Sequence, residues 1–286
     1  MTAERIQSRR SFIFSPGNRP DLYPKALASG ADIVCVELED GVASHDKADA
    51  RAKMLELFAE PPPDDGIERI VRVNALSTDD GKADMAAILG AERGPPAIML
   101  PKVNSPEDVR GVADTFDENG LTTRIQAIIE TNKGLEAAYE IAHATPRLDA
   151  LLFGAVDLAA ELRCDNTWEA MLYARSRTVH AAAAADIDVI DVPWLDLEDM
   201  DGMRREAEAS AGLGYTGKGA IHPKQIAILN QVYSPDPGEV AYARKVIDAF
   251  AAANTGVVVV DGKLIERPVL RTLHRILARA GRMSAA

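Results

Sequence analysis

Ile125-Gln-Ala-Ile-Ile129 and Ala150-Leu-Leu-Phe153 are two short, mainly apolar runs that enclose an alanine-rich segment, Thr131–Ala144. Each run is short enough for one β-strand, and neither alternates regularly between apolar and polar residues. That pattern is typical of parallel strands buried on both faces. The alanine-rich segment between them favours a helix. The sequence therefore predicts a strand–helix–strand unit over residues 125–153.

The same pattern recurs on both sides of this unit. Six further strand-like runs are Ser11–Ser15, Ile33–Leu38, Arg69–Val73, Ala97–Leu100, Ile187–Val192 and Gly217–Ile221. Helix-like segments separate the runs, including Ala48–Phe58, Trp168–Ala184 and Asp199–Ala211. Eight strands that alternate with helices predict an α/β fold of the (β/α)8 TIM-barrel type rather than an open sheet.

The C-terminal part of the chain exceeds what eight strand–helix units need. It comprises a helix-like run (Pro237–Ala253), a valine-rich stretch (Gly256–Val260), the turn Asp261-Gly-Lys263 and a basic helix. We therefore expect two parts, a catalytic barrel over residues 1–230 and a C-terminal helical extension over residues 231–286. The extension is expected to act as a lid, as an oligomerisation arm or as both.

Composition excludes several classes of protein. The 32 basic and 44 acidic residues give a net charge of −12, which argues against general binding to nucleic acid. Two cysteines cannot form a disulfide framework, so a reduced, cytoplasmic setting is expected. No apolar run approaches the ~18 residues of a membrane span, and the N-terminal stretch shows no secretory signal. We expect neither nucleic acid nor membrane as a partner.

Two patterns that suggest chemistry have simpler explanations. Gly212-Leu-Gly-Tyr-Thr-Gly217 matches a nucleotide-binding glycine motif, but its glycines leave a helix and enter a strand. A phosphate loop needs the reverse order, so we expect a helix end and a tight turn. Cys35 lies within an apolar run, which favours a buried structural cysteine over a nucleophile.

Two acidic residues stand out by position. Glu130 and Asp157 each follow a predicted strand, and the two strands are consecutive. The ends of consecutive barrel strands are neighbours at the rim that carries active sites. Two carboxylates there could hold one Mg²⁺ ion and leave positions open for substrate oxygens and water. The alternative is that both are helix caps or first-turn acids, which are common after strands.

Other predicted strand ends add charged residues to the same rim. Glu37, Glu39 and Asp40 cluster at the end of the second run, and Arg72 lies near the end of the third. An arginine beside a metal could neutralise a carboxylate or a developing enolate, or it could form a salt bridge to Glu39 or Asp40. Arg19 and Lys25 follow the first run, where their positive charges could meet phosphate groups.

Seven blocks of the sequence, in order, resemble the citrate lyase β-subunit-like proteins of the aldolase/citrate lyase superfamily, which includes malyl-CoA and citramalyl-CoA lyases. The resemblance extends from residue 9 to about residue 280. The blocks are Arg9-Arg-Ser-Phe-Ile-Phe-Ser-Pro-Gly-Asn-Arg-Pro20, Val36-Glu-Leu-Glu-Asp-Gly-Val42, Arg72-Val-Asn74, Ile129-Glu-Thr-Asn-Lys-Gly134, Phe153-Gly-Ala-Val-Asp-Leu158, Gly217-Lys-Gly-Ala-Ile-His-Pro-Lys-Gln225 and Asp261-Gly-Lys-Leu-Ile265.

The resemblance implies a Mg²⁺-dependent barrel that cleaves or forms a carbon–carbon bond beside a thioester. Its expected substrates are a CoA thioester of the malyl or citramalyl type and a 2-keto acid. Glu130 and Asp157 fall on the family's metal ligands, and Arg72 falls on its enolate-stabilising arginine. Asp261 falls on an acid that a neighbouring subunit's lid supplies as the catalytic base. Arg19 and Lys25 fall near family residues that contact CoA phosphates. Glu39 and Asp40 fall on residues that the resemblance implies orient Arg72 or metal-bound water.

The resemblance also implies a homotrimer or hexamer, and it leaves several activities open. They are a citrate lyase β-subunit acting on an acyl-carrier-protein thioester, a malate-synthase-like enzyme that hydrolyses the thioester after condensation, and a pyruvate aldolase without a thioester. A degenerate, non-catalytic CoA-binding paralogue is a further alternative. Val156 stands where the family commonly has an acid, and Trp194 lies where substrate side groups are expected to be recognised.

Overall fold

Eight parallel strands form a closed barrel in which β1 to β8 pair in sequence order and β8 pairs back to β1. The structure is a computed structural model and describes residues 8–253 and 256–283. The barrel strands are β1 (Ser11–Pro16), β2 (Ile33–Glu37), β3 (Glu68–Arg72), β4 (Ala97–Leu100), β5 (Arg124–Ile129), β6 (Leu148–Phe153), β7 (Asp188–Asp191) and β8 (Gly217–Ala220). The predicted (β/α)8 barrel is confirmed, and each of the eight predicted runs overlaps one of its strands.

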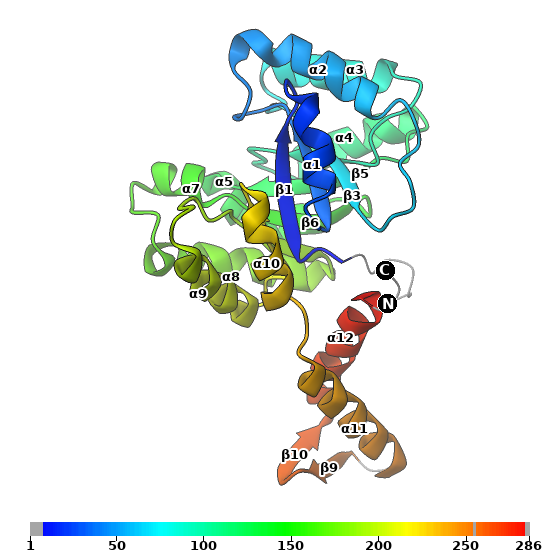
Figure 1. Cartoon of the computed structure of the whole chain (residues 1–286), viewed down its shortest axis with the longest axis vertical. Coiled ribbons are helices and arrows are strands. Elements are labelled where there is room, and N and C mark those ends of the chain that lie inside the picture. Colours follow the sequence, from blue (N-terminus) through cyan, green and yellow to red (C-terminus); the bar gives the residue numbers. More distant parts are fainter. Residues whose placement is uncertain (1–7, 254–255, 284–286) are drawn as a thin grey trace. The chain divides into compact units, whose positions relative to one another are not determined.

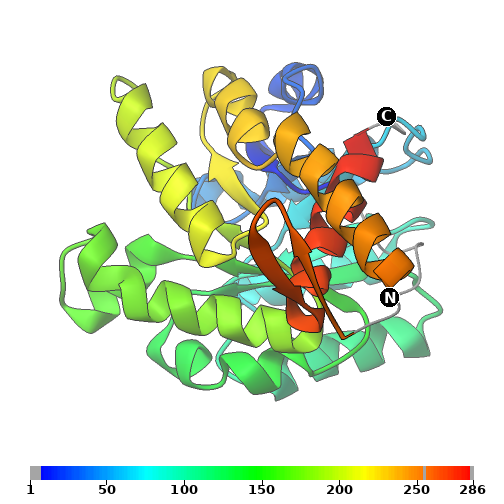
Figure 2. The same ribbon diagram turned by 90° about the horizontal axis from the view of Figure 1, so that it is seen from below.

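Helices follow the strands and lie on the outside of the barrel (Figure 1; Figure 2). Within residues 9–230 they are α1 (Tyr23–Leu27), α2 (Lys47–Leu57), α3 (Asp79–Gly90), α4 (Pro106–Glu118), α5 (Asn132–Glu136), α6 (Ala138–Ala142), α7 (Ala155–Leu162), α8 (Trp168–Ala185) and α9 (Met200–Leu213), followed by α10 (Ile226–Val232). Short 3-10 turns are η2 (Pro20–Leu22), η3 (Ser44–Asp46) and η4 (Pro223–Gln225). In the described part of the chain, no helix has both the length and the apolar composition needed to cross a membrane.

One predicted helix is interrupted. The segment Thr131–Ala144 forms α5 and α6 instead of a single helix, because Ala137 between them leaves the helical region with φ −90° and ψ 9°. Alanine is a strong helix former, so no local signal marks this break. The glycine pattern after α9 behaves as predicted: Gly214 ends the helix at φ +120° and β8 begins three residues later.

The barrel interior is filled by apolar side chains from neighbouring strands. This set comprises Phe12, Ile33, Cys35, Ile70, Ala97, Met99, Ile128, Leu152 and Ile190, and Phe14 packs against it. Cys35 is fully buried, and burial raises the pKa of its thiol, so it has the structural role that the sequence predicts. A packed interior confines open chemistry to the loops at the two rims.

A buried ionic cluster connects the amino ends of the barrel strands. Glu68, at the start of β3, accepts hydrogen bonds from Arg9 (2.7 Å to Nε) and from Gln126 (3.1 Å), and pairs with Arg124 at 2.8 Å. Arg9 also reaches Asp149 at 2.8 Å. Burial alone would raise the pKa of Glu68, but the two arginines outweigh it and lower that pKa.

Replacing Glu68 by glutamine is expected to lower the free energy of unfolding by about 3 kcal/mol, because two arginines lose their buried partner. The folded pKa of Glu68 is lowered, so its contribution is present above the unfolded pKa of about 4.3 and is lost as the pH falls through the folded pKa. Urea unfolding at pH 7 should therefore show the full difference in unfolding free energy between wild type and Glu68→Gln. This difference should become smaller below about pH 4. The exposed Glu107, replaced in the same way, is the control. A difference below about 1 kcal/mol at pH 7 would contradict a stabilising role for this cluster.

Contacts divide the chain into two compact units, Arg9–Asn230 and a second that contains the chain from Gln231 onward. The second unit comprises α11 (Pro237–Ala253), β9 (Val257–Val260), β10 (Lys263–Glu266) and α12 (Arg267–Met283). β9 and β10 form an antiparallel hairpin, and the unit has its own apolar core, made of Ala243, Val246, Val260, Ile265 and Leu273. Asp261 and Gly262 form the hairpin turn with φ of +49° and +76°, values that an Asp-Gly pair adopts readily.

Candidate active site

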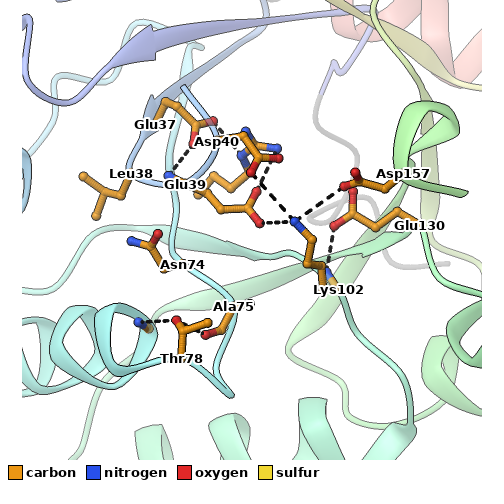
Figure 3. Close-up of polar contacts among 12 residues, drawn as sticks. Glu37, Leu38, Glu39, Asp40, Asn74, Ala75, Thr78, Lys102, Glu130 and Asp157 are labelled. Carbon is orange, nitrogen blue, oxygen red and sulfur yellow. Dashed lines mark hydrogen bonds and ion pairs between the residues drawn. The ribbon is translucent and has the colours of Figure 1, made fainter. Parts of the chain in front are cut away.

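The carboxyl ends of β2 to β6 bring charged side chains to one rim of the barrel (Figure 3). Arg72 is the last residue of β3, and Glu130 follows β5 directly. Asp157 lies in the first turn of α7, four residues after β6 ends. The structure therefore brings together Arg72, Glu39, Asp40, Glu130 and Asp157, which the sequence predicted as site residues from separate strand ends.

Arg72 is held by two carboxylates and one aromatic ring. Its Nε lies 2.6 Å from Glu37 Oε2, and its Nη1 lies 3.2 Å from Glu39 Oε2. The guanidinium carbon lies 4.9 Å from the centre of the Phe14 ring, within the range of a cation–π contact. The predicted pairing of Arg72 with Glu39 is observed, whereas Asp40 contacts a different cation. These contacts fix the guanidinium in one orientation at the rim.

The loop after β2 is tightly braced. Glu37 Oε1 accepts a hydrogen bond from the Glu39 backbone N at 2.5 Å, and burial raises the pKa of Glu37. Lys47 Nζ donates to the backbone oxygens of Leu38 and Glu39, both at 2.9 Å, and to Asn74 Oδ1 at 2.5 Å. The backbone that carries Glu39 is thus connected to both α2 and the loop after β3.

Lys102 lies at the centre of the cluster, although it is not among the site residues predicted from the sequence. Its Nζ is 2.9 Å from Glu39 Oε1, 3.5 Å from Asp157 Oδ2 and 3.8 Å from Asp40 Oδ1. Figure 3 shows its ammonium between the loop after β2 and the carboxylates of Glu130 and Asp157. Burial lowers the pKa of Lys102, but the neighbouring carboxylates outweigh this and raise it. The signal in the sequence was its place two residues after the fourth apolar run.

Glu130 is a buried carboxylate in a negative environment. Burial is the main cause that raises its pKa to about 8, and the charges of Glu39 and Asp157 add to the effect. The Lys102 backbone N donates to its Oε1 at 2.8 Å, which opposes the shift. Thr131, not Glu130, caps α5, so a role as helix cap does not account for Glu130.

Gly154 gives the Glu130 side chain its space. A Cβ at residue 154 would lie 2.5 Å from Glu130 Cβ and 2.6 Å from its Oε2, far closer than van der Waals contact. The φ of Gly154 is −104°, which any residue adopts, so the requirement is steric. The glycine between β6 and α7 therefore allows the loops that carry Glu130 and Asp157 to approach each other.

Gly154→Ala is expected to displace the Glu130 carboxylate and to weaken binding of Mg²⁺ by about tenfold or more. Calorimetric titration of the purified variant with MgCl₂ measures this directly. Gly111→Ala in α4 is the matched control, because a Cβ there meets no atom within 4 Å. Unchanged Mg²⁺ affinity in a folded Gly154→Ala protein would remove Glu130 from the predicted metal site.

The residues fit a hard divalent cation. Among the described side chains of the cluster, carboxylates outnumber the two cations Arg72 and Lys102, and their oxygens are the ligands that Mg²⁺ prefers. Within residues 8–253 and 256–283, no set of three or more His, Cys, Asp or Glu side chains is arranged to hold a metal. A site built on Glu130 and Asp157 therefore depends on substrate oxygens and water for its other ligands.

Arg19 and Lys25 follow β1 at the same end of the barrel but lie outside the carboxylate cluster. Arg19 Nη2 pairs with Asp21 Oδ2 at 2.8 Å, and both side chains are more than half exposed. The hydrogen bond from Arg19 lowers the pKa of Asp21. Lys25 is an exposed residue of α1. Both side chains are open to a ligand from solvent.

Asp261 belongs to the second unit, in the turn between β9 and β10. Its carboxylate pairs with Lys245 Nζ at 2.6 Å, and both side chains are about half exposed. An exposed surface pair contributes little to stability, so this aspartate is available for another partner. Its turn conformation is one that aspartate and asparagine both tolerate.

Two further residues, His222 and Trp194, have structural contacts. His222 accepts a hydrogen bond from the Lys224 backbone N at 3.1 Å, a contact that holds the turn after β8. Trp194 is half-buried, and its backbone oxygen accepts from Gln225 Nε2 at 2.9 Å. A Cβ at Gly202 would lie 2.8 Å from the Trp194 ring, so glycine is needed there for packing.

Residues 10–223 match the model of the HpcH/HpaI aldolase/citrate lyase family. Three curated proteins align over nearly the whole chain. Citrate lyase subunit beta of Escherichia coli (strain K12) is 34% identical over 96% of this chain and 94% of its own length. The (3S)-malyl-CoA thioesterase of Cereibacter sphaeroides (strain ATCC 17029) is 37% identical over 99% and 98%, and the mitochondrial citramalyl-CoA lyase of Rattus norvegicus is 31% identical over 95% and 86%.

A solved structure agrees with these matches. The protein CitE from Mycobacterium tuberculosis, in complex with magnesium, acetoacetate and coenzyme A, is 32% identical to this chain. The match covers 95% of this chain and 97% of that one, with a TM-score of 0.79. The structural similarity therefore extends over nearly the whole chain.

Proposed function

Because the chain belongs to the HpcH/HpaI aldolase/citrate lyase family, we propose that it is a Mg²⁺-dependent carbon–carbon lyase for a 3-hydroxyacyl-CoA thioester. The substrate is of the malyl-CoA or citramalyl-CoA type, and the products are acetyl-CoA and a 2-keto acid, or the reverse. The observation that carries this proposal is the rim where Arg72 lies among Glu39, Glu130 and Asp157. Relatives named for citramalyl-CoA and malyl-CoA support the thioester.

Glu130 and Asp157 would hold the Mg²⁺. Support comes from their oxygen ligands, the net negative charge of the cluster and the magnesium in the related CitE complex. When bound, the ion supplies Lewis acidity and a template for the keto-acid oxygens. Glu39 and Asp40 would act indirectly, since Glu39 orients Arg72 and both acids bind the Lys102 ammonium.

The proposed cleavage has three steps. A base removes the proton of the substrate hydroxyl, and the bond between C2 and C3 breaks as the keto carbonyl forms. The bonding electrons pass to the acetyl thioester as an enolate, whose negative charge Arg72 stabilises. Protonation of the enolate carbon then gives acetyl-CoA. We assign the base to Asp261 of a neighbouring subunit, which implies a homotrimer or hexamer with the C-terminal extension as a lid.

Arg19 and Lys25 are proposed to contact the phosphates of CoA. Support comes from their position after β1 at the carboxyl end of the barrel, from their exposure and from their positive charge. This assignment favours a free CoA thioester over a free acid, because a free acid leaves both cations without a role. A cytoplasmic location is proposed from the low cysteine content.

Product analysis tests the proposed reaction. The protein is incubated with malyl-CoA or citramalyl-CoA and MgCl₂, and the products are separated by chromatography. A lyase gives acetyl-CoA with glyoxylate or pyruvate in equal amounts, whereas a thioesterase gives free CoA and the hydroxy acid. Free CoA without keto acid would contradict the lyase activity and indicate a thioesterase, the activity named for the Cereibacter relative. Turnover confined to an acyl-carrier-protein thioester would point to a citrate lyase β-subunit.

A further inference from the structure

Lys102 is held at the rim by its backbone as well as by its side chain. It follows the end of β4 by two residues and has φ +53°, an unusual conformation for a residue other than glycine. Its backbone N donates to Glu130 Oε1 at 2.8 Å. The backbone of this residue thus contacts one carboxylate of the proposed metal site directly.

The ammonium of Lys102 contacts the second carboxylate. Nζ lies 3.5 Å from Asp157 Oδ2 and 2.9 Å from Glu39 Oε1, so it connects the loop after β2 with the first turn of α7 (Figure 3). This charge therefore compensates acidic groups that would otherwise repel each other.

The other cations near the cluster are engaged in different ways. Arg72 is stacked on Phe14 and bound to Glu37 and Glu39. Lys47 donates to backbone oxygens and to Asn74. The Lys102 ammonium, by contrast, stands at the end of a flexible four-carbon side chain that is 37% exposed. Its distance to Asp157 is longer than a normal hydrogen bond. Its ammonium can leave Asp157 without breaking a buried network.

We propose that the Lys102 ammonium is an internal counter-ion that stabilises the acidic cluster without metal and competes with Mg²⁺ for Asp157. The inference rests on the metal site of the proposed function. Binding of Mg²⁺ requires the ammonium to give up Asp157, while Glu39 and Asp40 remain available to hold it. Lys102 is therefore a positioning residue that sets the metal affinity and keeps the cluster assembled before the ion arrives.

Lys102→Met removes the charge but keeps the length of the stem. Without this competing charge, the Kd for Mg²⁺ measured by calorimetry should fall by about tenfold. The metal-free protein should melt at a lower temperature than wild type, because Glu39, Asp40 and Asp157 lose their shared cation. The rise in melting temperature on adding MgCl₂ should be larger in the variant, since tighter binding gives greater stabilisation.

Two control proteins make the test specific. Lys102→Arg keeps the positive charge and should retain a Kd close to that of wild type. Lys82→Met removes an exposed lysine of α3 that pairs with Asp79. It should change neither the Kd for Mg²⁺ nor the melting temperature. An unchanged or weaker Mg²⁺ affinity in folded Lys102→Met, with wild type still binding Mg²⁺, would overturn the counter-ion role alone. Absence of Mg²⁺ binding in wild type and all variants would overturn the metal site and this inference with it.

Discussion

Replacing Glu130 by glutamine or Asp157 by asparagine is expected to reduce Mg²⁺-dependent turnover by about 10³-fold or more, without loss of the fold. Each change removes a carboxylate charge that the proposed site uses to hold the ion, while the side-chain volume is kept. Steady-state assays at a Mg²⁺ concentration that saturates wild type, with circular dichroism as the check on folding, measure both effects.

Glu118→Gln is the control for this prediction, because Glu118 is an exposed acid in α4. It should retain the activity of wild type. Calorimetry adds a readout that does not depend on turnover: both site variants should lose Mg²⁺ binding, and the control should keep it. Unaltered activity in Glu130→Gln and in Asp157→Asn would remove the metal site from this account.

The second large effect concerns Asp261. Asp261→Asn is expected to lower kcat by about 10²-fold or more, with Mg²⁺ affinity unchanged, if this carboxylate is the general base. Asparagine suits the test because it tolerates the positive φ of the turn as aspartate does. The hairpin should therefore keep its shape, and the loss should report the carboxylate alone.

Mixed oligomers test whether the base comes from another subunit. Subunits with Asp261→Asn are combined with subunits with Arg72→Ala, each of which is expected to have little activity alone. If a site uses Arg72 of one subunit and Asp261 of its neighbour, random mixing gives both groups to about a quarter of the sites. Activity should return to that extent. No recovery in oligomers shown to contain both subunits would place the two groups on a single chain or exclude Asp261 as the base.

The barrel was predictable because its sequence signals are local. Continuous apolar runs such as Ile33–Leu38 and Ala97–Leu100 mark strands buried on both faces, and their number and alternation with helices define the closed sheet. Residues at or just after the ends of these runs lie at one rim, which is why the sequence could place Arg72, Glu130 and Asp157 near one another. The break at Ala137 was not predictable, because alanine is a strong helix former.

Lys102 is a residue whose contacts could not be predicted from the sequence. Its place after the fourth apolar run is visible in the sequence, but its role depends on contacts with the loop after β2 and with the first turn of α7. The same holds for Gly154, whose lack of a side chain matters only because Glu130, at the end of the neighbouring strand, lies against it. Such requirements arise from distances between elements, which a single sequence does not reveal.

The most direct test of the central claim is the release of a 2-keto acid from malyl-CoA and citramalyl-CoA, followed first with EDTA and then after MgCl₂ is restored. We expect no keto acid with EDTA and stoichiometric glyoxylate or pyruvate, together with acetyl-CoA, once Mg²⁺ is present. Keto-acid release that continues in EDTA would contradict the Mg²⁺-dependent mechanism. Failure to cleave either thioester, by a protein that binds Mg²⁺, would contradict the proposed substrate class.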